Sequence, residues 1–419
     1  MPSMTTPILD NFNRADGSVG SNWTSPVWTG DGSFSIISNQ FGAVSGTNIS
    51  MYWSATSFSA DQEAYVTIMT PPANDSANVV SVYCRLSGQG TAAPTYYAAT
   101  LRKLSGTDTV TLERIVSGTI TSIGSAKSIE FAAGDGLALT CVGSVIASWR
   151  RSGSTWIFVD AVNDTTITSG GYIGIESRQV ARLDDFGGGN YVPIRFPTTP
   201  IRDNFNRANE LALTTASNGE TWALIPDQGT IGLGAVAISS NVTYSTAGPG
   251  SFDMLTTTDA ADCEGYVTIS TKGSSTNDEV TVDIRMQQTS SYTTVDGYAV
   301  RAIVQAGTDT ILLARVDNVI ATTIATYNQE FSSGDAVGIR CTGSIIEAFY
   351  RSGSSGPFTR LGGVVDSTYS SGGRQAITIV GTNTRADDFG GGAFIGGGQM
   401  SACGKSLCGV LGGVCQGTV

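Results

Sequence analysis

The stretch Asp10-Asn-Phe-Asn-Arg-Ala15, near the start of the chain, returns as Asp203-Asn-Phe-Asn-Arg-Ala208. A second stretch, Asp184-Asp-Phe-Gly-Gly-Gly189, returns as Asp387-Asp-Phe-Gly-Gly-Gly392. Between these marks the register holds, because the run that begins at Cys141 returns at Cys341. A repeat of this length can bury a core of its own, whereas the short repeat of a solenoid cannot. The sequence therefore predicts two copies of one domain.

The repeat sets the domain boundaries that we expect. The first copy covers residues 1–190 and the second covers residues 201–392, with a proline-containing linker at 191–200. A tail at 393–419 lies outside the repeat and mixes glycine with scattered apolar residues and three cysteines. Such a segment cannot bury enough apolar area by itself to offset its ordering entropy. We therefore expect the tail to be an assembly element that packs against another chain.

Alternating apolar and polar residues mark strands in both copies. The run from Ala64 to Ile68 matches the run from Gly265 to Ile269, and hairpin-like pairs of runs follow at 137–149 and 337–349. Short strands separated by Gly, Ser and Asn are typical of an all-β sandwich or barrel. No convincing amphipathic helix is present. The predicted fold class is all-β.

Charge and composition exclude several classes of function. The net charge is −12, and there are only four lysines and no basic run, which argues against nucleic acid and against anionic membrane surfaces as partners. The chain has no histidine, so the commonest general base and the usual zinc ligand are both missing. No apolar stretch is long enough for a membrane span.

The start of the chain carries no basic and apolar segment of the kind that directs secretion. We therefore expect synthesis in a cytoplasm without a cleaved signal peptide. The cysteines inside strand-like patterns form no CxxC motif and are expected to be small buried residues. Cys141 and Cys341 are repeat equivalents, so each is predicted to fill the same core position in its own copy.

A family resemblance extends this interpretation. The run Gly134-Asp135, Leu139, Gly143-Ser-Val-Ile146 and Arg151-Ser-Gly153 resembles the laminin-G and concanavalin A-like jelly roll. The stretch Ser169-Gly-Gly-Tyr-Ile-Gly174 and the Asp-Asp-Phe motif that closes each copy extend the resemblance. It implies two tandem antiparallel jelly-roll β-sandwiches. Domains of this subtype are similar to those in minor tail and other virion proteins of tailed bacteriophages.

The leading functional expectation follows from that resemblance. It implies a non-enzymatic phage virion protein, located in the virion and in contact with other virion proteins and host cell-surface glycan, and we expect a homo-oligomer. One alternative is a carbohydrate-active enzyme or its binding module. Another is a ligand-free decoration protein of the capsid or tail. Glucanases of this fold place the motif Glu-x-Asp-x-x-Glu on one strand, and because this chain lacks that spacing, we predict that it is not an enzyme.

Aromatic residues are the candidate glycan contacts, since aromatic faces flanked by Ser, Thr and Asn can stack on sugar rings. Trp23 and Trp222 correspond between the copies and are expected in the core. Four aromatics are less constrained by the repeat and are the candidates for glycan binding: Trp28, Tyr52, Trp53 and Tyr96.

Acidic residues gather at both ends of each repeat. Because the first and last strands of a jelly roll commonly pair, these ends are expected to meet. One interpretation is a calcium site made from hard oxygen ligands. The other, which the arginines of the motif favour, is a charge-assisted clasp from Arg14 to Asp184 or Asp185, and from Arg207 to Asp387 or Asp388. The residues concerned are Asp10, Arg14, Asp184 and Asp185 in the first copy, and Asp203, Arg207, Asp387 and Asp388 in the second. No other cofactor is expected.

Overall fold

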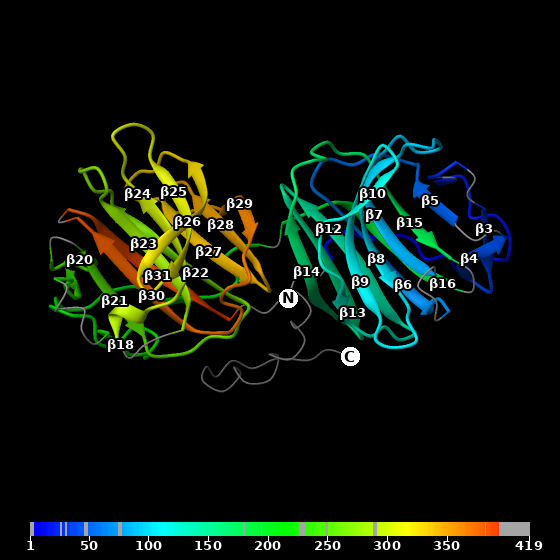
Figure 1. Cartoon of the computed structure of the whole chain (residues 1–419). Helices are drawn as coiled ribbons and strands as arrows, with labels where there is room; N and C mark the ends of the chain where they lie inside the picture. Colours follow the sequence, from blue (N-terminus) through cyan, green and yellow to red (C-terminus); the bar gives the residue numbers. More distant parts are fainter. Residues whose placement is uncertain are drawn as a thin grey trace, which may run out of the picture.

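The computed structural model describes residues 4–25, 27–29, 32–45, 49–73, 78–178, 181–193, 195–225, 232–247, 250–287, 291–381 and 383–393. Within these ranges the chain forms antiparallel strands and a single short 3₁₀ turn, η2 (Tyr292–Thr294), so the predicted all-β class is confirmed. Figure 1 shows two sandwiches side by side, the first drawn from blue to green and the second from green to red. The predicted assembly tail, 393–419, lies outside the described residues except for Ala393.

The first sandwich consists of two sheets, which we call A1 and B1. Sheet A1 has the order β14-β13-β12-β6-β16-β4-β3, with β1 also paired to β16. Its strands are β1 (Ile8–Asp10), β3 (Ser33–Ile37), β4 (Gln40–Ser45), β6 (Gln62–Thr70), β12 (Asp135–Val142), β13 (Val145–Ser152), β14 (Thr155–Asn163) and β16 (Arg182–Asn190).

Sheet B1 faces A1 across the core and has the order β10-β9-β8-β7-β15-β5-β2, with β11 also paired to β9. Its strands are β2 (Trp23–Thr24), β5 (Ile49–Trp53), β7 (Val79–Ser87), β8 (Thr95–Arg102), β9 (Thr109–Val116), β10 (Thr119–Ser122), β11 (Lys127–Ser128) and β15 (Tyr172–Ser177).

The second sandwich repeats this plan in sheets A2 and B2. Sheet A2 has the order β19-β20-β31-β22-β27-β28-β29, with β17 paired to β31. Its strands are β17 (Ile201–Asp203), β19 (Val236–Ser239), β20 (Val242–Ser245), β22 (Cys263–Thr271), β27 (Ala336–Thr342), β28 (Ile345–Arg351), β29 (Thr359–Val365) and β31 (Arg385–Ala393).

Sheet B2 has the order β18-β21-β30-β23-β24-β25-β26. Its strands are β18 (Trp222–Ala223), β21 (Ser251–Leu255), β23 (Glu279–Met286), β24 (Gly297–Ile303), β25 (Thr310–Asp317), β26 (Ile320–Asn328) and β30 (Arg374–Val380). The strand order of each sheet thus recurs between the copies, with the first and last strands of each copy paired as expected.

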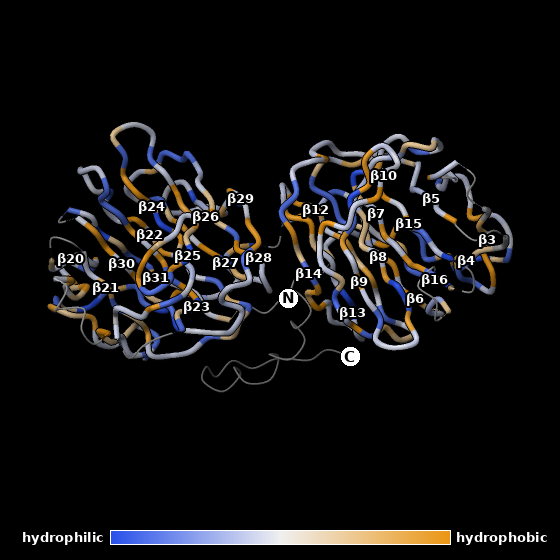
Figure 2. Tube along the Cα trace, viewed as in Figure 1, coloured by the Kyte–Doolittle hydropathy of each residue, from blue (hydrophilic) through white to orange (hydrophobic). Residues whose placement is uncertain are grey.

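One core lies between the two sheets of each sandwich. Alternate residues of the strands point inward, and Figure 2 shows the resulting alternation of hydrophobic and hydrophilic positions along the chain. Cys141 and Cys341 are fully buried in their respective cores, and they pair across the hairpin with Ile146 and Ile346. The two cysteines therefore occupy equivalent positions.

A buried arginine holds together the loops at one end of each sandwich. Arg85 is 1 % exposed and donates to the carbonyl oxygens of Ala60, Ile167 and Gly143 at 2.6–2.8 Å. Its equivalent, Arg285, is fully buried and donates to the corresponding carbonyls at 2.6–2.9 Å. Backbone carbonyls satisfy the donors of a guanidinium that would otherwise be costly to bury.

The two sandwiches meet through the outer faces of their A sheets, near β14 and β29 (Figure 1). Ile345 and Val365 of the second sandwich pack into an apolar cluster that includes Val145 and Trp149 of the first. The outer faces of sheets B1 and B2 lie on the opposite side of each core from this contact.

Candidate functional site

The predicted acidic ends come together, but the ion pair differs from the predicted one. Arg14 donates to both carboxylate oxygens of Asp10, at 2.7 and 3.0 Å, and not to Asp184 or Asp185. Trp23 adds a bond from its Nε1 to Asp10 at 2.8 Å. Burial alone would raise the pKa of Asp10, but the hydrogen bonds from Arg14 and Trp23 outweigh it and lower that pKa.

The second copy repeats this link. Asp203 accepts from Arg207 at 2.7 Å and from Trp222 Nε1 at 2.8 Å, and is fully buried. The chain turns sharply two residues after each aspartate, at Phe12 (φ 49°) and Phe205 (φ 50°), which carries the arginine back over its own strand. The expected ion pair considered only the pairing of the first and last strands. The local turn explains why the arginine reaches the nearer aspartate instead.

The aspartates of the last strands have a different environment. Asp184 and Asp387 each accept a hydrogen bond from the next backbone N–H at 2.8 Å. Burial, with the charges of Asp388 and Asp203, raises the pKa of Asp387 to about 6. Among the described residues, no three His, Cys, Asp or Glu side chains are grouped closely enough to hold a metal ion.

Three of the four predicted aromatic residues lie together on the outer face of sheet B1. Trp28 donates from Nε1 to the hydroxyl of Tyr96 at 2.8 Å, and the ring of Tyr96 lies 4.3 Å from that of Tyr83. Tyr52 and Tyr172 are in contact, with ring centroids 5.1 Å apart. We call this cluster of Trp28, Tyr52, Tyr83, Tyr96 and Tyr172 the aromatic face.

The fourth predicted residue, Trp53, is in the core instead. It is 7 % exposed, and its ring lies edge-on to Trp23 at 5.6 Å. Neighbouring residues of a strand point to opposite sides, so Tyr52 and Trp53 cannot both lie on the outer face. The expectation that Trp53 contacts glycan is therefore wrong, and strict strand alternation could have excluded it.

The rings of the aromatic face differ in their accessibility. Tyr83 and Tyr96 are 1 % and 3 % exposed, whereas Trp28, Tyr52 and Tyr172 are half-buried. The buried pair therefore forms a platform, and the three outer rings remain accessible to a ligand. Accessible rings beside hydroxyl groups are suited to stack on the apolar faces of sugars.

A polar network that the sequence did not indicate underlies these rings. Glu176 accepts from the hydroxyl of Tyr83 at 2.6 Å and pairs with Arg178 at 2.9 Å. On the neighbouring strands, Glu113 pairs with Arg102 at 2.6 Å and accepts from Thr100 at 2.7 Å. These bonds hold the platform in place, because a satisfied buried network fixes the positions of its members.

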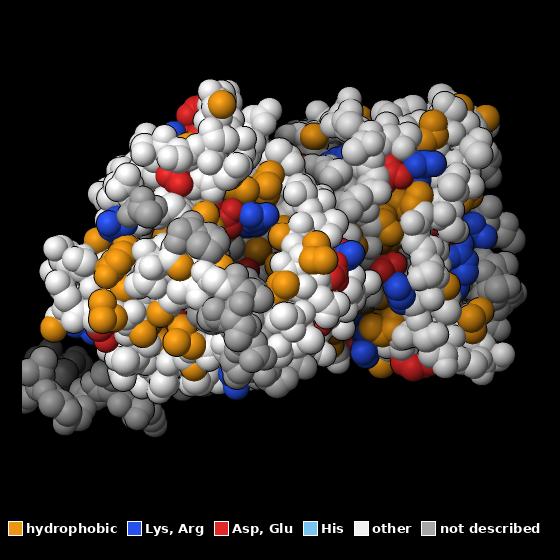
Figure 3. All heavy atoms as spheres, turned by 60° about the vertical axis from the view of Figure 1, so that its left-hand side comes forward, with side chains coloured by type: hydrophobic (Ala, Val, Ile, Leu, Met, Phe, Trp, Pro, Cys, Tyr) orange, Lys and Arg blue, Asp and Glu red, His pale blue; other side chains and the backbone are white. Residues whose placement is uncertain are grey.

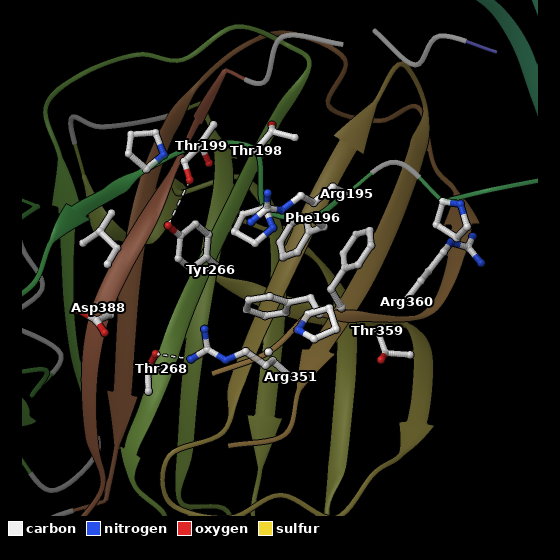
Figure 4. A pocket seen from close by; sticks show the side chains of 18 of the residues that line it. Arg195, Phe196, Thr198, Thr199, Tyr266, Thr268, Arg351, Thr359, Arg360 and Asp388 are labelled. Atoms are coloured by element: carbon white, nitrogen blue, oxygen red, sulfur yellow. Dashed lines mark hydrogen bonds between the residues drawn. The ribbon is translucent and has the colours of Figure 1, made fainter. Parts of the chain in front are cut away.

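A groove of about 1430 Å³ lies on the outer face of sheet A2, beside the linker (Figure 4). The linker crosses this sheet and is held by Glu264, which accepts from the backbone and hydroxyl groups of Thr198 and Thr199 at 2.5–3.0 Å. Tyr266 donates to the carbonyl of Thr199, and Arg351 donates to Thr268 at 3.2 Å. Aromatic rings of Phe196, Phe349 and Phe358 complete the groove.

The first sandwich holds its own leading segment in the same way. Glu63 accepts from Thr5 and Thr6 at 2.6–3.2 Å, and Arg151 donates to Thr67 at 2.6 Å. Glu264 and Arg351 of the groove thus have counterparts in the first copy, and in both copies the glutamate fixes the segment that precedes the first strand. The aromatic face has no such repetition: positions equivalent to Tyr52, Tyr83 and Tyr172 carry Met254, Asp283 and Arg374.

In the space-filling view most of the visible surface is uncharged, with acidic and basic side chains in small scattered groups (Figure 3). None of the described residues forms a helix of the length and apolarity that crossing a bilayer requires.

Comparison with known proteins finds similar solved structures at low sequence identity. No family model matches the chain, and no curated protein is similar in sequence. The carbohydrate-binding module CBM66 from Bacillus subtilis is 15 % identical, with 42 % of this chain and 92 % of that chain covered and a TM-score of 0.27. The basic winged bean lectin with Tn-antigen is 9 % identical, with 47 % and 96 % covered and a TM-score of 0.31.

A third similar structure is the GH43 protein BlXynB from Bacillus licheniformis, which is 10 % identical, with 85 % and 73 % covered and a TM-score of 0.33. The expectation that this chain is not an enzyme is contradicted by the presence of GH43 proteins among its structural neighbours. The virion and phage expectations find no support among them. The chain's structural neighbours are all-β proteins of the jelly-roll and lectin-like kind.

Proposed function

We propose that this protein binds carbohydrate, and that the aromatic face of the first sandwich is the binding site. The observation that carries the proposal is the gathering of Trp28, Tyr52 and Tyr172, all half-buried, on one outer sheet face. The hydroxyls of Tyr52 and Tyr172 make no hydrogen bond within the described structure, so both can donate to or accept from a sugar.

The contrast between the copies supports this proposal. Folding requires the core and the buried arginines, and these recur in both sandwiches. The aromatic face does not recur, although the second sandwich has the same strand order. A fold that forms without these rings in one copy does not need them in the other, so their presence calls for another explanation. Binding of a ligand is the explanation that fits their exposure.

A glycan array with the full chain tests the proposal. Binding to one or a few neutral glycans by the wild type, lost in Tyr52→Ala and Tyr172→Ala but kept in Met254→Ala, would support it. No binding, or binding equally retained by the two tyrosine variants, would refute it. Measuring reducing ends released from the bound glycan then separates a binding module from a carbohydrate-active enzyme, the two forms that this proposal includes.

The setting of the protein remains a further proposal. Attachment to a virion, contacts with other virion proteins, a homo-oligomeric state and an assembly role for 393–419 are consistent with binding to host cell-surface glycan. Peptides of this chain in purified particles, and their loss when 393–419 is deleted, would support that setting. A protein found only outside particles would refute it.

A further inference from the structure

The outer face of sheet B2 differs chemically from the aromatic face of the first sandwich. A pocket of about 190 Å³ lies over β21, β30, β23, β24 and β25. Its walls are mainly apolar and include Phe252, Met286, Val295 and Val316. Polar side chains line one part of it: Glu279, Thr281, Asp283, Arg301 and Thr378. We call it the acidic pocket.

Asp283 is the buried charged group of this pocket with the fewest hydrogen-bond partners. It is 4 % exposed and lines the pocket. Its carboxylate accepts one hydrogen bond, from the hydroxyl of Thr378 at 3.2 Å. A carboxylate can accept about four hydrogen bonds, so most of its capacity is open toward the cavity. Burying an ionised carboxylate in this state is costly unless a donor or a cation joins it, and without one the group takes up a proton instead.

The nearby ion pair does not neutralise Asp283. Arg301 donates to both oxygens of Glu279, at 2.6 and 3.1 Å, and Thr281 adds a third bond to Glu279 at 2.7 Å. This bidentate pair satisfies itself. The negative charge of ionised Asp283 therefore has no cation paired with it in the pocket.

The first sandwich lacks all three ionisable groups at the equivalent positions. Val79, Tyr83 and Thr100 stand where the second sandwich has Glu279, Asp283 and Arg301. The core of the fold therefore does not require these charges. The first sandwich places its own charges on this face elsewhere, at Arg102, Glu113 and Glu176. The arrangement around Asp283 is therefore specific to the second sandwich and indicates a ligand of its own.

We propose that the acidic pocket binds a small molecule with a protonated amine. Its ammonium group would lie against Asp283 and its carbon skeleton against Phe252 and Met286. An ammonium group supplies both the missing hydrogen-bond donors and the missing positive charge. The apolar walls favour a compact carbon skeleton. An amino sugar and a simple alkyl amine share this chemistry. The site is independent of the aromatic face and stands or falls separately from it.

The proposal implies a defined dependence on pH. Burial raises the pKa of Asp283 to about 7, and the charge of Glu279 adds to this while that of Arg301 opposes it. The residues that line the pocket from β21, β25, β26 and β30 carry no charge. An alkyl ammonium keeps its proton up to about pH 9, as lysine does. Its affinity should therefore rise roughly tenfold or more between pH 5.5 and pH 8, as Asp283 ionises.

Calorimetric titration of the full chain with n-butylamine, its neutral analogue 1-butanol, glucosamine and glucose tests the site. We expect n-butylamine to bind and 1-butanol not to bind, with the stated rise in affinity with pH. Binding of glucosamine but not of glucose identifies the amino sugar as a ligand of the pocket; binding of n-butylamine alone identifies the simple alkyl amine.

Two variants separate the pocket from the general negative charge of the protein. Asp283→Asn keeps the shape and the bond from Thr378 but removes the charge, and should weaken amine binding at least tenfold. Glu330→Gln removes a charge from a side chain that is 61 % exposed in the same sandwich and should leave binding unchanged. Failure of both amines to bind, equal binding of glucose and glucosamine when Tyr52 and Tyr172 are both replaced by alanine, or undiminished amine binding by folded Asp283→Asn would overturn the proposal.

Discussion

Tyr83 in the first sandwich and Asp283 in the second occupy equivalent positions on the central strands β7 and β23 of their outer faces. Tyr83 donates to Glu176 and supports the aromatic face, whereas Asp283 lines the acidic pocket. Two residues further along, Arg85 and Arg285 are both buried and make the same bonds. On this strand the position that the fold requires is the same in both copies, whereas the position on the outer face differs between them.

A buried carboxyl should make the second sandwich less stable as pH rises. Asp253 is fully buried, accepts from the backbone N–H of Val236 at 2.5 Å, and has one oxygen without a partner. Burial raises its pKa from 3.8 to about 8. The folded state therefore holds a proton that the unfolded state loses, and the associated stability, complete below about pH 4, is lost as pH rises toward 8.

The expected slope is about 1.4 kcal/mol per pH unit between these limits. Asp253→Asn keeps an acceptor for Val236 but cannot titrate, so it should flatten the pH dependence of unfolding of the second sandwich by about that slope. Chemical denaturation at pH 5, 6 and 7 measures it. The equivalent position in the first sandwich is Met51. An unchanged slope in Asp253→Asn would show that the carboxyl does not titrate in this range.

Replacing the buried arginine of the first sandwich should be strongly destabilising. Arg85→Met leaves three carbonyl oxygens without donors, each worth about 1–3 kcal/mol when buried. We expect a loss of about 3 kcal/mol or more in the free energy of unfolding. The exposed Arg195→Met is the matched control and should cost little. Equal, small effects of the two variants would contradict the assignment of Arg85 as a structural anchor.

The ion pair at the start of each copy should contribute modestly to the free energy of unfolding. Arg14 is 37 % exposed in its side chain, so solvent screening reduces the value of its pair with Asp10, and Arg14→Ala should cost about 1 kcal/mol. Addition of a calcium chelator should leave the melting temperature unchanged. A large fall in melting temperature with chelator, together with no effect of Arg14→Ala, would instead establish the calcium interpretation of these acidic ends.

Removing the positive charge of Arg340 should detach the linker from sheet A2. Arg340, on β27, pairs with Glu264 of β22 at 2.6 Å and donates to the carbonyl of Arg195 at 2.9 Å. It therefore connects the sheet directly to the linker. Arg340→Met leaves Glu264, which is fully buried, without its cation. We expect faster proteolysis within 191–200 at unchanged stability of the first sandwich. Proteolysis at the wild-type rate would show that the threonine bonds to Glu264 suffice.

The repeat made the fold readable from the sequence, because each strand run could be checked against its equivalent. The all-β class and the equivalent positions of Cys141 and Cys341 follow from periodicity and register, whereas the pairing of the first and last strands follows from the resemblance to the jelly roll. The partner of Arg14 did not follow, since it depends on the turn at Phe12, where the backbone adopts a left-handed conformation. Local backbone geometry of that kind leaves little trace in apolar periodicity.

The candidate sites were only partly predictable for a similar reason. Unrepeated aromatics indicated Trp28, Tyr52 and Tyr96, but Tyr172 and Glu176 come from β15, far along the sequence, and reach the site through the strand order of B1. Asp283 carries no signal in its local pattern, because an acidic residue on a strand is usually solvated. Comparing the two copies position by position would have marked it, since Tyr83 is its counterpart.

The most direct test of the central claim exchanges the aromatic face for its counterpart in the second copy. The double variant Tyr52→Met and Tyr172→Arg introduces the residues found at the equivalent positions, which the fold already accommodates. Two lost ring contacts of about 1–1.5 kcal/mol each correspond to a fall in glycan affinity of roughly 100-fold. Calorimetric titration with a glycan that binds the wild type should show this fall at an unchanged melting temperature. Wild-type affinity in the folded double variant would contradict the account.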